Sequence, residues 1–388
     1  MTPASSRTRF AAPIAVLAVL AGGLLAAQQP PAPPAAPQQA RPANARAHRV
    51  ATFDSGFGGY FTAKEIEKQA KALSADGYGP FEIAHYGDTT NIPYGEKTPE
   101  QVAAFASAGI LAAFRDGAAD VYVACNTAST QIDRIREILR AESASYPNHV
   151  HSIIDVSVRE VMRTVSAKLK TQDVVVVGIL ATPATVKTEN YPRFLAKALG
   201  GGFAPGEFRK LTQARWLSAK GPTIDSVAYV SEIALGPKKK VVVYQLAPAN
   251  WVEMIENGAP DAQKRDAVSR DLAMLTGETR PGDRFDVVGE FCTHYPVFDA
   301  MIRAELTRLG KVAADAPFVV QGPLMGRLFL AEFLQRKPVK AAGAVPPPGT
   351  PPFYMSGTNI ESTKALVKTI FPNDPAPLIA HKDFVIRQ

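Results

Sequence analysis

The 388-residue chain has only two cysteines, Cys125 and Cys292, and it lacks the short motifs that mark the common cofactor enzymes. It has no P-loop, no dinucleotide-binding glycine fingerprint and no metal-ligand spacing. The glycines from Gly56 to Gly59 lack the spacing that holds a pyrophosphate. No lysine is marked as a Schiff-base partner, which a pyridoxal enzyme would need. We therefore expect a protein that uses neither a cofactor nor a metal ion.

The chain also lacks any stretch with a strong charge of one sign. Charged residues make up 20% of the sequence and apolar residues 46%, a balance typical of a soluble globular protein. The formal net charge of +7 is spread along the chain, and the one tight basic run, Lys238–Lys240, directly precedes the strand-like Val241–Val243. A solvated entrance to a strand is the simpler interpretation of that run. We expect no nucleic-acid partner.

A long apolar run occurs at the N-terminus. Arg7 and Arg9 precede an apolar stretch over residues 10–27, and a tract rich in Pro, Ala and Gln follows. This order is typical of a secretory signal peptide, residues 1–27, and of an extended linker, residues 28–47. We expect an exported, periplasmic protein with no stable membrane insertion after signal cleavage. A membrane anchor formed by an uncleaved N-terminus is the alternative, because the run is close to the minimum length for a span.

The rest of the sequence alternates strand-like and helix-like segments, which predicts an α/β fold. We expect two similar domains, each with a mainly parallel sheet flanked by helices, and an active site in the cleft between them. Residues 48–147 and 300–388 would form the first domain, and residues 148–299 the second. The segment from Gly200 to Lys240 is expected outside the catalytic core. The clearest strands are Val50–Phe53, Glu82–Tyr86, Val121–Ala124, Val174–Leu180, Val241–Tyr244 and Phe285–Val288.

Polar and reactive side chains follow these strands at the points where the strands end. Ligands of open parallel sheets bind at the carboxyl ends of the strands, so such residues are expected to share one site. The residues in this position are Asp54, Asp88, Cys125, Thr182 and Cys292.

The two cysteines of an exported protein would ordinarily suggest a disulfide. Here each cysteine stands at a predicted helix start, where the helix dipole favours a thiolate. Each is also followed by hydroxyl or amide side chains that suit a carboxylate, namely Asn126, Thr127 and Thr293. The sequence around Cys125 and Cys292 therefore predicts two reactive thiols that face each other across a cleft.

Five motifs, in order along the chain, resemble those of glutamate racemases, and the chain is similar to the aspartate/glutamate racemase family. The resemblance implies a cofactor-independent isomerase that interconverts L- and D-glutamate, in which one thiolate removes the Cα proton and the opposite thiol returns one. It also implies that a terminal strand lies near Phe353–Gly357. The motifs are residues 54–59, residues 86–89 with 93–97, residues 124–129, residues 181–186 and residues 292–296.

The resemblance assigns roles to individual residues. Asp54 would assist Cys125, and His294 would assist Cys292, although the residues alone also fit a helix N-cap and a structural histidine. Glu256 lies where the family often has a glutamate, and it fits a solvated surface helix equally well. The substrate would be a small anionic amino acid, and a homodimer is compatible with this interpretation. The residues that would hold the substrate are Ser55, Pro93, Tyr94, Gly95, Asn126, Thr127, Thr185 and Thr293.

Four features depart from the family pattern and bear on substrate specificity. Phe291 replaces the small glycine that usually precedes the second cysteine, and Glu290 adds a charge beside it. The segments 200–240 and 336–352 are longer than usual. An aspartate or broad-specificity racemase of the same superfamily is therefore an alternative. An exported solute-binding protein for a small anionic ligand is another, but such a protein would not require a cysteine after two separate strands.

Overall fold

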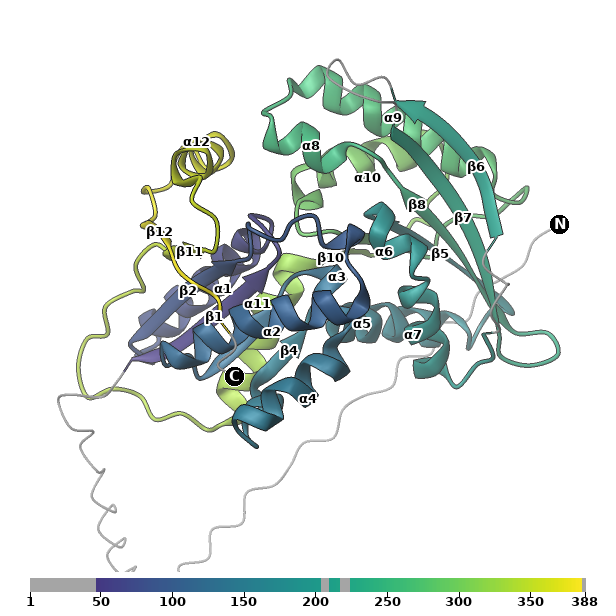
Figure 1. The fold of residues 1–388 in the computed structure, drawn as a ribbon. Coiled ribbons are helices and arrows are strands. Elements are labelled where there is room, and N and C mark those ends of the chain that lie inside the picture. The colour runs from purple at the N-terminus through teal and green to yellow at the C-terminus, as the bar shows by residue number, and fades with distance from the viewer. Residues whose placement is uncertain (1–46, 204–208, 217–223, 386–388) are drawn as a thin grey trace, which may run out of the picture. The chain divides into compact units, whose positions relative to one another are not determined.

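The computed structural model of the chain describes residues 47–203, 209–216 and 224–385 (Figure 1). The predicted signal peptide and all but the last residue of the predicted linker lie outside the described residues, so both stay predictions. Within the described ranges, no helix is long and apolar enough to cross a bilayer.

The first sheet has six strands, all parallel, in the order β12-β11-β2-β1-β3-β4. Its alternate residues pack on two different cores: Val50 contacts the core that contains α1 and α11, and Ala51 contacts the core that contains α2 and α4. The strands are β1 (His48–Asp54), β2 (Phe81–Gly87), β3 (Asp120–Val123), β4 (Val150–Ser152), β11 (Phe353–Met355) and β12 (Ile379–His381); the helices are α1 (Gly59–Ala75), α2 (Pro99–Arg115), α3 (Asn126–Ser129), α4 (Ile132–Glu142) and α11 (Gln321–Gln335).

The second sheet has the order β10-β9-β5-β8-β7-β6. Its first four strands are parallel to one another, β7 is antiparallel to β8, and β6 is antiparallel to β7. Strand β5 is buried on both faces, with Val175 and Val177 toward α5 and α7, and Val176 toward α8, α9 and α10. The strands are β5 (Val174–Ala181), β6 (Arg209–Trp216), β7 (Ile224–Ala234), β8 (Lys240–Ala247), β9 (Val287–Phe291) and β10 (Phe318–Val320); the helices are α5 (Ile153–Lys168), α6 (Pro183–Lys187), α7 (Asn190–Leu199), α8 (Trp251–Glu256), α9 (Asp261–Gly277) and α10 (Asp299–Arg308). Helix α12 (Ile360–Ile370) lies between β11 and β12 in the chain and contacts β12 of the first sheet.

The two sheets confirm the predicted fold class. The points at which the chain passes from one sheet to the other differ from the predicted domain boundaries. Strand β4 pairs with β3 of the first sheet, so by sheet membership the change of sheet comes after Ser152 rather than after Pro147. Strand β10 pairs with β9 of the second sheet, so the return comes after Val320 rather than after Asp299. Both strands have three residues, which is too short for a recognisable hydrophobic pattern.

The long segment from Gly200 to Lys240 is a hairpin that widens the second sheet (Figure 1). Strand β7 pairs with β8 along its length, and Ala228 and Val230 are buried in the core with α8 and α9. The described residues of this segment do not line the cavity that holds the two cysteines. The hairpin therefore lies outside the catalytic core, but its inner strand is an integral part of the sheet.

Candidate active site

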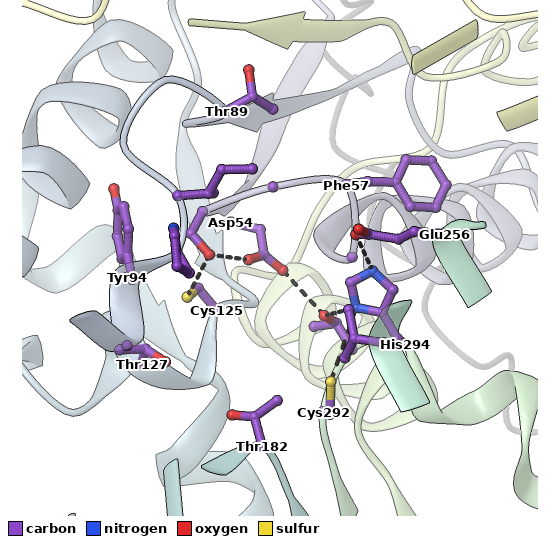
Figure 2. Close-up of a pocket in the computed structure, with 18 of the residues that line it drawn as sticks. Asp54, Phe57, Thr89, Tyr94, Cys125, Thr127, Thr182, Glu256, Cys292 and His294 are labelled. Carbon is purple, nitrogen blue, oxygen red and sulfur yellow. Dashed lines mark hydrogen bonds and ion pairs between the residues drawn. The ribbon is translucent and has the colours of Figure 1, made fainter. Parts of the chain in front are cut away.

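A cavity of about 680 Å³ lies at the carboxyl ends of strands from both sheets, within the size range of small-molecule sites. Asp54, the last residue of β1, lines it together with Cys125 from the loop after β3, and Thr182 and Cys292 line it from the loops after β5 and β9 (Figure 2). The expectation that ligands bind at the carboxyl ends of parallel strands thus placed all four of these side chains correctly.

Two residues that were expected at the site, Asp88 and Thr185, do not line this cavity, and the Asp88 carboxylate accepts hydrogen bonds from Tyr94 and Ser356 instead. Thr185 is buried in the first turn of α6, where its hydroxyl lies 3.0 Å from that of Thr182, and Thr182 lines the cavity instead. The predicted residues that do line the cavity are Asp54, Ser55, Pro93, Tyr94, Gly95, Cys125, Asn126, Thr127, Glu256, Cys292, Thr293 and His294.

Cys125 is a buried thiol at the start of α3. Its sulfur accepts a hydrogen bond from the Ala128 amide at 3.3 Å and donates to the Ser55 hydroxyl at 3.5 Å. Burial, and then the nearby charge of Asp54, raise the pKa of Cys125 to about 12. The expectation that its helix start would favour the thiolate is therefore wrong for the empty site, because α3 has only four residues and cannot offset the loss of hydration.

Cys292 has a different environment. No α-helix starts directly after it: a short 3-10 turn, Tyr295–Val297, comes first, and α10 begins only at Asp299. The sulfur lies 3.9 Å from Nδ1 of His294, whose Nε2 lies 3.1 Å from a carboxylate oxygen of Glu256. Burial lowers the pKa of His294, but the contacts with Cys292 and Glu256 outweigh it and raise the pKa to about 10. At neutral pH an imidazolium therefore stands beside the Cys292 sulfur and stabilises negative charge there.

Asp54 connects the two cysteine environments through hydroxyl groups (Figure 2). One of its carboxylate oxygens accepts from Ser55 and the other from Thr293, both at 3.2 Å. Burial raises the pKa of Asp54, and the charge of His294 acts against that rise. Asp54 is not a helix N-cap, because α1 is preceded by Gly58 and has no side-chain cap.

Gly58 lets the loop after β1 approach the loop after β9. A Cβ atom at this position would lie 2.1 Å from the Thr293 hydroxyl and 2.6 Å from the His294 ring. Such distances are sterically forbidden, so any larger residue would push the two loops apart. The glycine-rich motif that could not hold a pyrophosphate thus has a steric role here.

Several lining residues were not predicted. Thr89 follows β2, and Val252 belongs to α8. The largest missed group belongs to α12 and the turn before it, which follow the predicted terminal strand after a few residues. The group consists of Thr358, Asn359, Ser362, Thr363 and Leu366. Its first members follow the strand Phe353–Met355, so the expectation that site residues follow the ends of parallel strands would have found them if it had been applied to this strand too.

The chain is similar to glutamate racemases in sequence and in fold. It is 29% identical to the glutamate racemase of Sulfurovum sp. (strain NBC37-1) over 254 residues, which are 64% of this chain and 71% of that protein. Its fold matches glutamate racemase isoform RacE1 from Bacillus anthracis with a TM-score of 0.58, at 20% identity, over 88% of this chain and 100% of that one. It also matches the glutamate racemase of Francisella tularensis subsp. tularensis SCHU S4 in complex with D-glutamate, with a TM-score of 0.55 at 16% identity over 88% and 98% of the two chains. No family model matches the chain.

Proposed function

We propose that the chain, which is 29% identical to a glutamate racemase over 71% of that protein's length, is a member of the aspartate/glutamate racemase family and interconverts L- and D-glutamate without a cofactor. The observation that carries the proposal is the pair of free thiols in one cavity, with Cys125 supplied by the first sheet and Cys292 by the second. Inversion at Cα requires a base on one face of the carbon and an acid on the other. Two cysteines from two sheets meet that requirement with the fewest groups.

The surroundings of the two thiols assign them different roles in the proton transfer. Cys125, with its raised pKa, starts as the proton donor. Cys292, whose sulfur lies 3.9 Å from the His294 ring, would act first as the base. In one turnover Cys292 gains the proton removed from Cα, and Cys125 gives its own proton to the opposite face of Cα. Cys125 is then ready to act as the base and Cys292 as the acid, so the roles are exchanged.

The cavity would hold the substrate's carboxylates with neutral donors. Its lining residues, all within the described part of the chain, include no lysine or arginine. The Thr127 hydroxyl and the Asn126 amide would donate in their place, and the hydroxyls of Ser55 and Thr293 would do so on turning away from Asp54. Asp54 would be a partner for the substrate ammonium.

Hydrogen exchange at Cα tests this proposal. The mature protein is incubated in deuterated water with each L- and D-amino acid in turn, and deuterium at Cα is measured by proton NMR together with optical rotation. We expect exchange and racemisation with glutamate, because removal of the Cα proton is the first chemical step. Faster exchange with aspartate or with many amino acids would assign the related specificity instead. No exchange with any amino acid would exclude the racemase and leave a binding protein.

We further propose that the protein is exported to the periplasm and keeps both thiols free there. Each sulfur must approach Cα from an opposite face, so the substrate separates the sulfurs by several Å, whereas a disulfide requires about 2.05 Å. We expect two titratable thiols in protein purified from the periplasm, unfolded without reductant and reacted with a thiol reagent. A Cys125–Cys292 peptide found by mass spectrometry in active protein would contradict this, and recovery of the chain only from the cytoplasm would contradict export.

A further inference from the structure

A buried cluster of polar side chains joins the Cys125 loop to helices of the second half of the chain. Gln321, at the start of α11, is fully buried and lies within hydrogen-bond distance of Asn126, Ser157 and Tyr191. Asn126 directly follows Cys125 and lines the cavity. The roles assigned so far to the site do not account for this cluster.

The primary amides of Asn126 and Gln321 pair with each other in both directions. Nδ2 of Asn126 donates to Oε1 of Gln321 at 2.8 Å, and Nε2 of Gln321 donates to Oδ1 of Asn126 at 3.0 Å. The Tyr191 hydroxyl donates to the same Oδ1 at 2.5 Å. With Gln321 and Tyr191 placed as they are, rotating the Asn126 amide alone by 180° would bring its N–H groups against two donors, so these two neighbours fix its orientation. In that orientation the second N–H of Asn126 has no acceptor in the described part of the chain.

The same cluster reaches the strand that carries the other cysteine. The Tyr191 ring stacks on Phe291 with centroids 4.1 Å apart and an interplanar angle of 22°. Phe291 directly precedes Cys292 and is fully buried. Gly289 makes room for it, because a Cβ there would lie 2.3 Å from the Phe291 ring. The aromatic residue that departs from the family pattern is therefore the contact through which Tyr191 packs against the Cys292 strand.

We propose that Gln321 and Tyr191 are positioning residues that hold the Asn126 amide with one N–H facing the cavity, where it binds a carboxylate of the substrate. The inference rests on the proposed function. It assigns neither residue a contact with the substrate, since both act through Asn126.

Kinetics of three variants test the proposal. Gln321→Met removes the amide pairing at similar side-chain size, and Tyr191→Phe removes the hydroxyl while keeping the ring against Phe291. Loss of one hydrogen bond to a charged group is expected to raise KM for both glutamate enantiomers about 10- to 100-fold, with kcat changed less than about threefold. Ser107→Ala is the matched control, because Ser107 is a buried serine of α2 that has no hydrogen-bond partner in the described part of the chain and does not line the cavity, and its KM should stay within about threefold of the wild type.

The outcome also separates positioning from a merely structural role. Folded Gln321→Met and Tyr191→Phe proteins with unchanged KM would overturn the proposal, as would an equal rise of KM in Ser107→Ala. Because both residues act on the same Oδ1, their double variant should show less than the product of the two single effects, and full multiplicativity would also contradict it.

A measurement that does not need activity keeps this inference distinct from the proposed function. In protein labelled with ¹⁵N-asparagine, one N–H proton of Asn126 should exchange slowly with water in the wild type. Both protons should exchange fast in Gln321→Met. Fast exchange of both in the wild type would overturn the positioning role, even where Cα exchange confirms the racemase. Absent Cα exchange with slow amide exchange would instead refute the racemase alone.

Discussion

Replacing Cys125 or Cys292 by serine is expected to lower glutamate racemisation at least about 1,000-fold in both directions. A positioned acid or base contributes roughly 10²–10⁴-fold to a proton transfer, and a serine hydroxyl is a much weaker acid than a thiol. The loss has to be equal for both enantiomers, because L- and D-glutamate are equally stable and the ratio of their kcat/KM values is fixed. Circular dichroism and polarimetry of each purified variant measure fold and racemisation together.

Each serine variant keeps one base, so a half-reaction distinguishes the two cysteines. A substrate analogue with a leaving group at Cβ loses that group after proton abstraction from one face alone. Each variant should therefore eliminate the leaving group from only one enantiomer, and the two variants should prefer opposite enantiomers. Near pH 8 the residual elimination should be faster in Cys125→Ser, which keeps the sulfur beside the imidazolium, than in Cys292→Ser, which keeps the thiol with its pKa raised to about 12. Elimination of the same enantiomer by both variants would refute the two-base mechanism.

The sequence predicts those parts of the fold and of the site that depend on a pattern within a short stretch of residues. Strand β5 has an apolar residue at every buried position and ends at a polar residue, Thr182, so both the strand and its contribution to the cavity follow from a short window. Cys125 and Cys292 follow from the same pattern. The raised pKa of Cys125 does not follow from that pattern, because its burial and the charge of Asp54 depend on other segments of the chain.

The parts that could not be predicted depend on contacts between distant segments. Gln321 lies 195 residues from Asn126, and nothing near it in the sequence indicates that its amide pairs with a residue of the cavity. Strand β4 is recognisable only once β3 is present beside it. Thr185 was assigned to the cavity because it belongs to a motif, but the turn of α6 directs it inward and leaves Thr182 exposed to the cavity.

Replacing His294 by asparagine is expected to lower kcat/KM at least about 100-fold for both enantiomers, because the Cys292 thiolate loses the imidazolium that stabilises it. The same residue should set the alkaline limit of activity. Both directions require the two cysteines to share one proton, so both enantiomers must give the same profile of kcat/KM against pH. His294 loses its proton near pH 10 and Cys125 near pH 12, so wild-type kcat/KM should fall first as His294 becomes neutral.

Glu256→Gln is the sharper form of this test, because it leaves both cysteines and His294 in place. The Glu256 carboxylate helps to raise the pKa of His294, so a neutral amide at position 256 should lower that pKa. The charged imidazolium then persists over a shorter pH range, and the fall of kcat/KM must begin at lower pH than in the wild type. The racemisation rate from pH 6 to 11 in the wild type, Glu256→Gln and His294→Asn measures the shift, with Cα exchange as an independent readout. An alkaline limit that stays in place in Glu256→Gln would mean that a group other than His294 sets it, and the imidazolium would then have no part in activating Cys292.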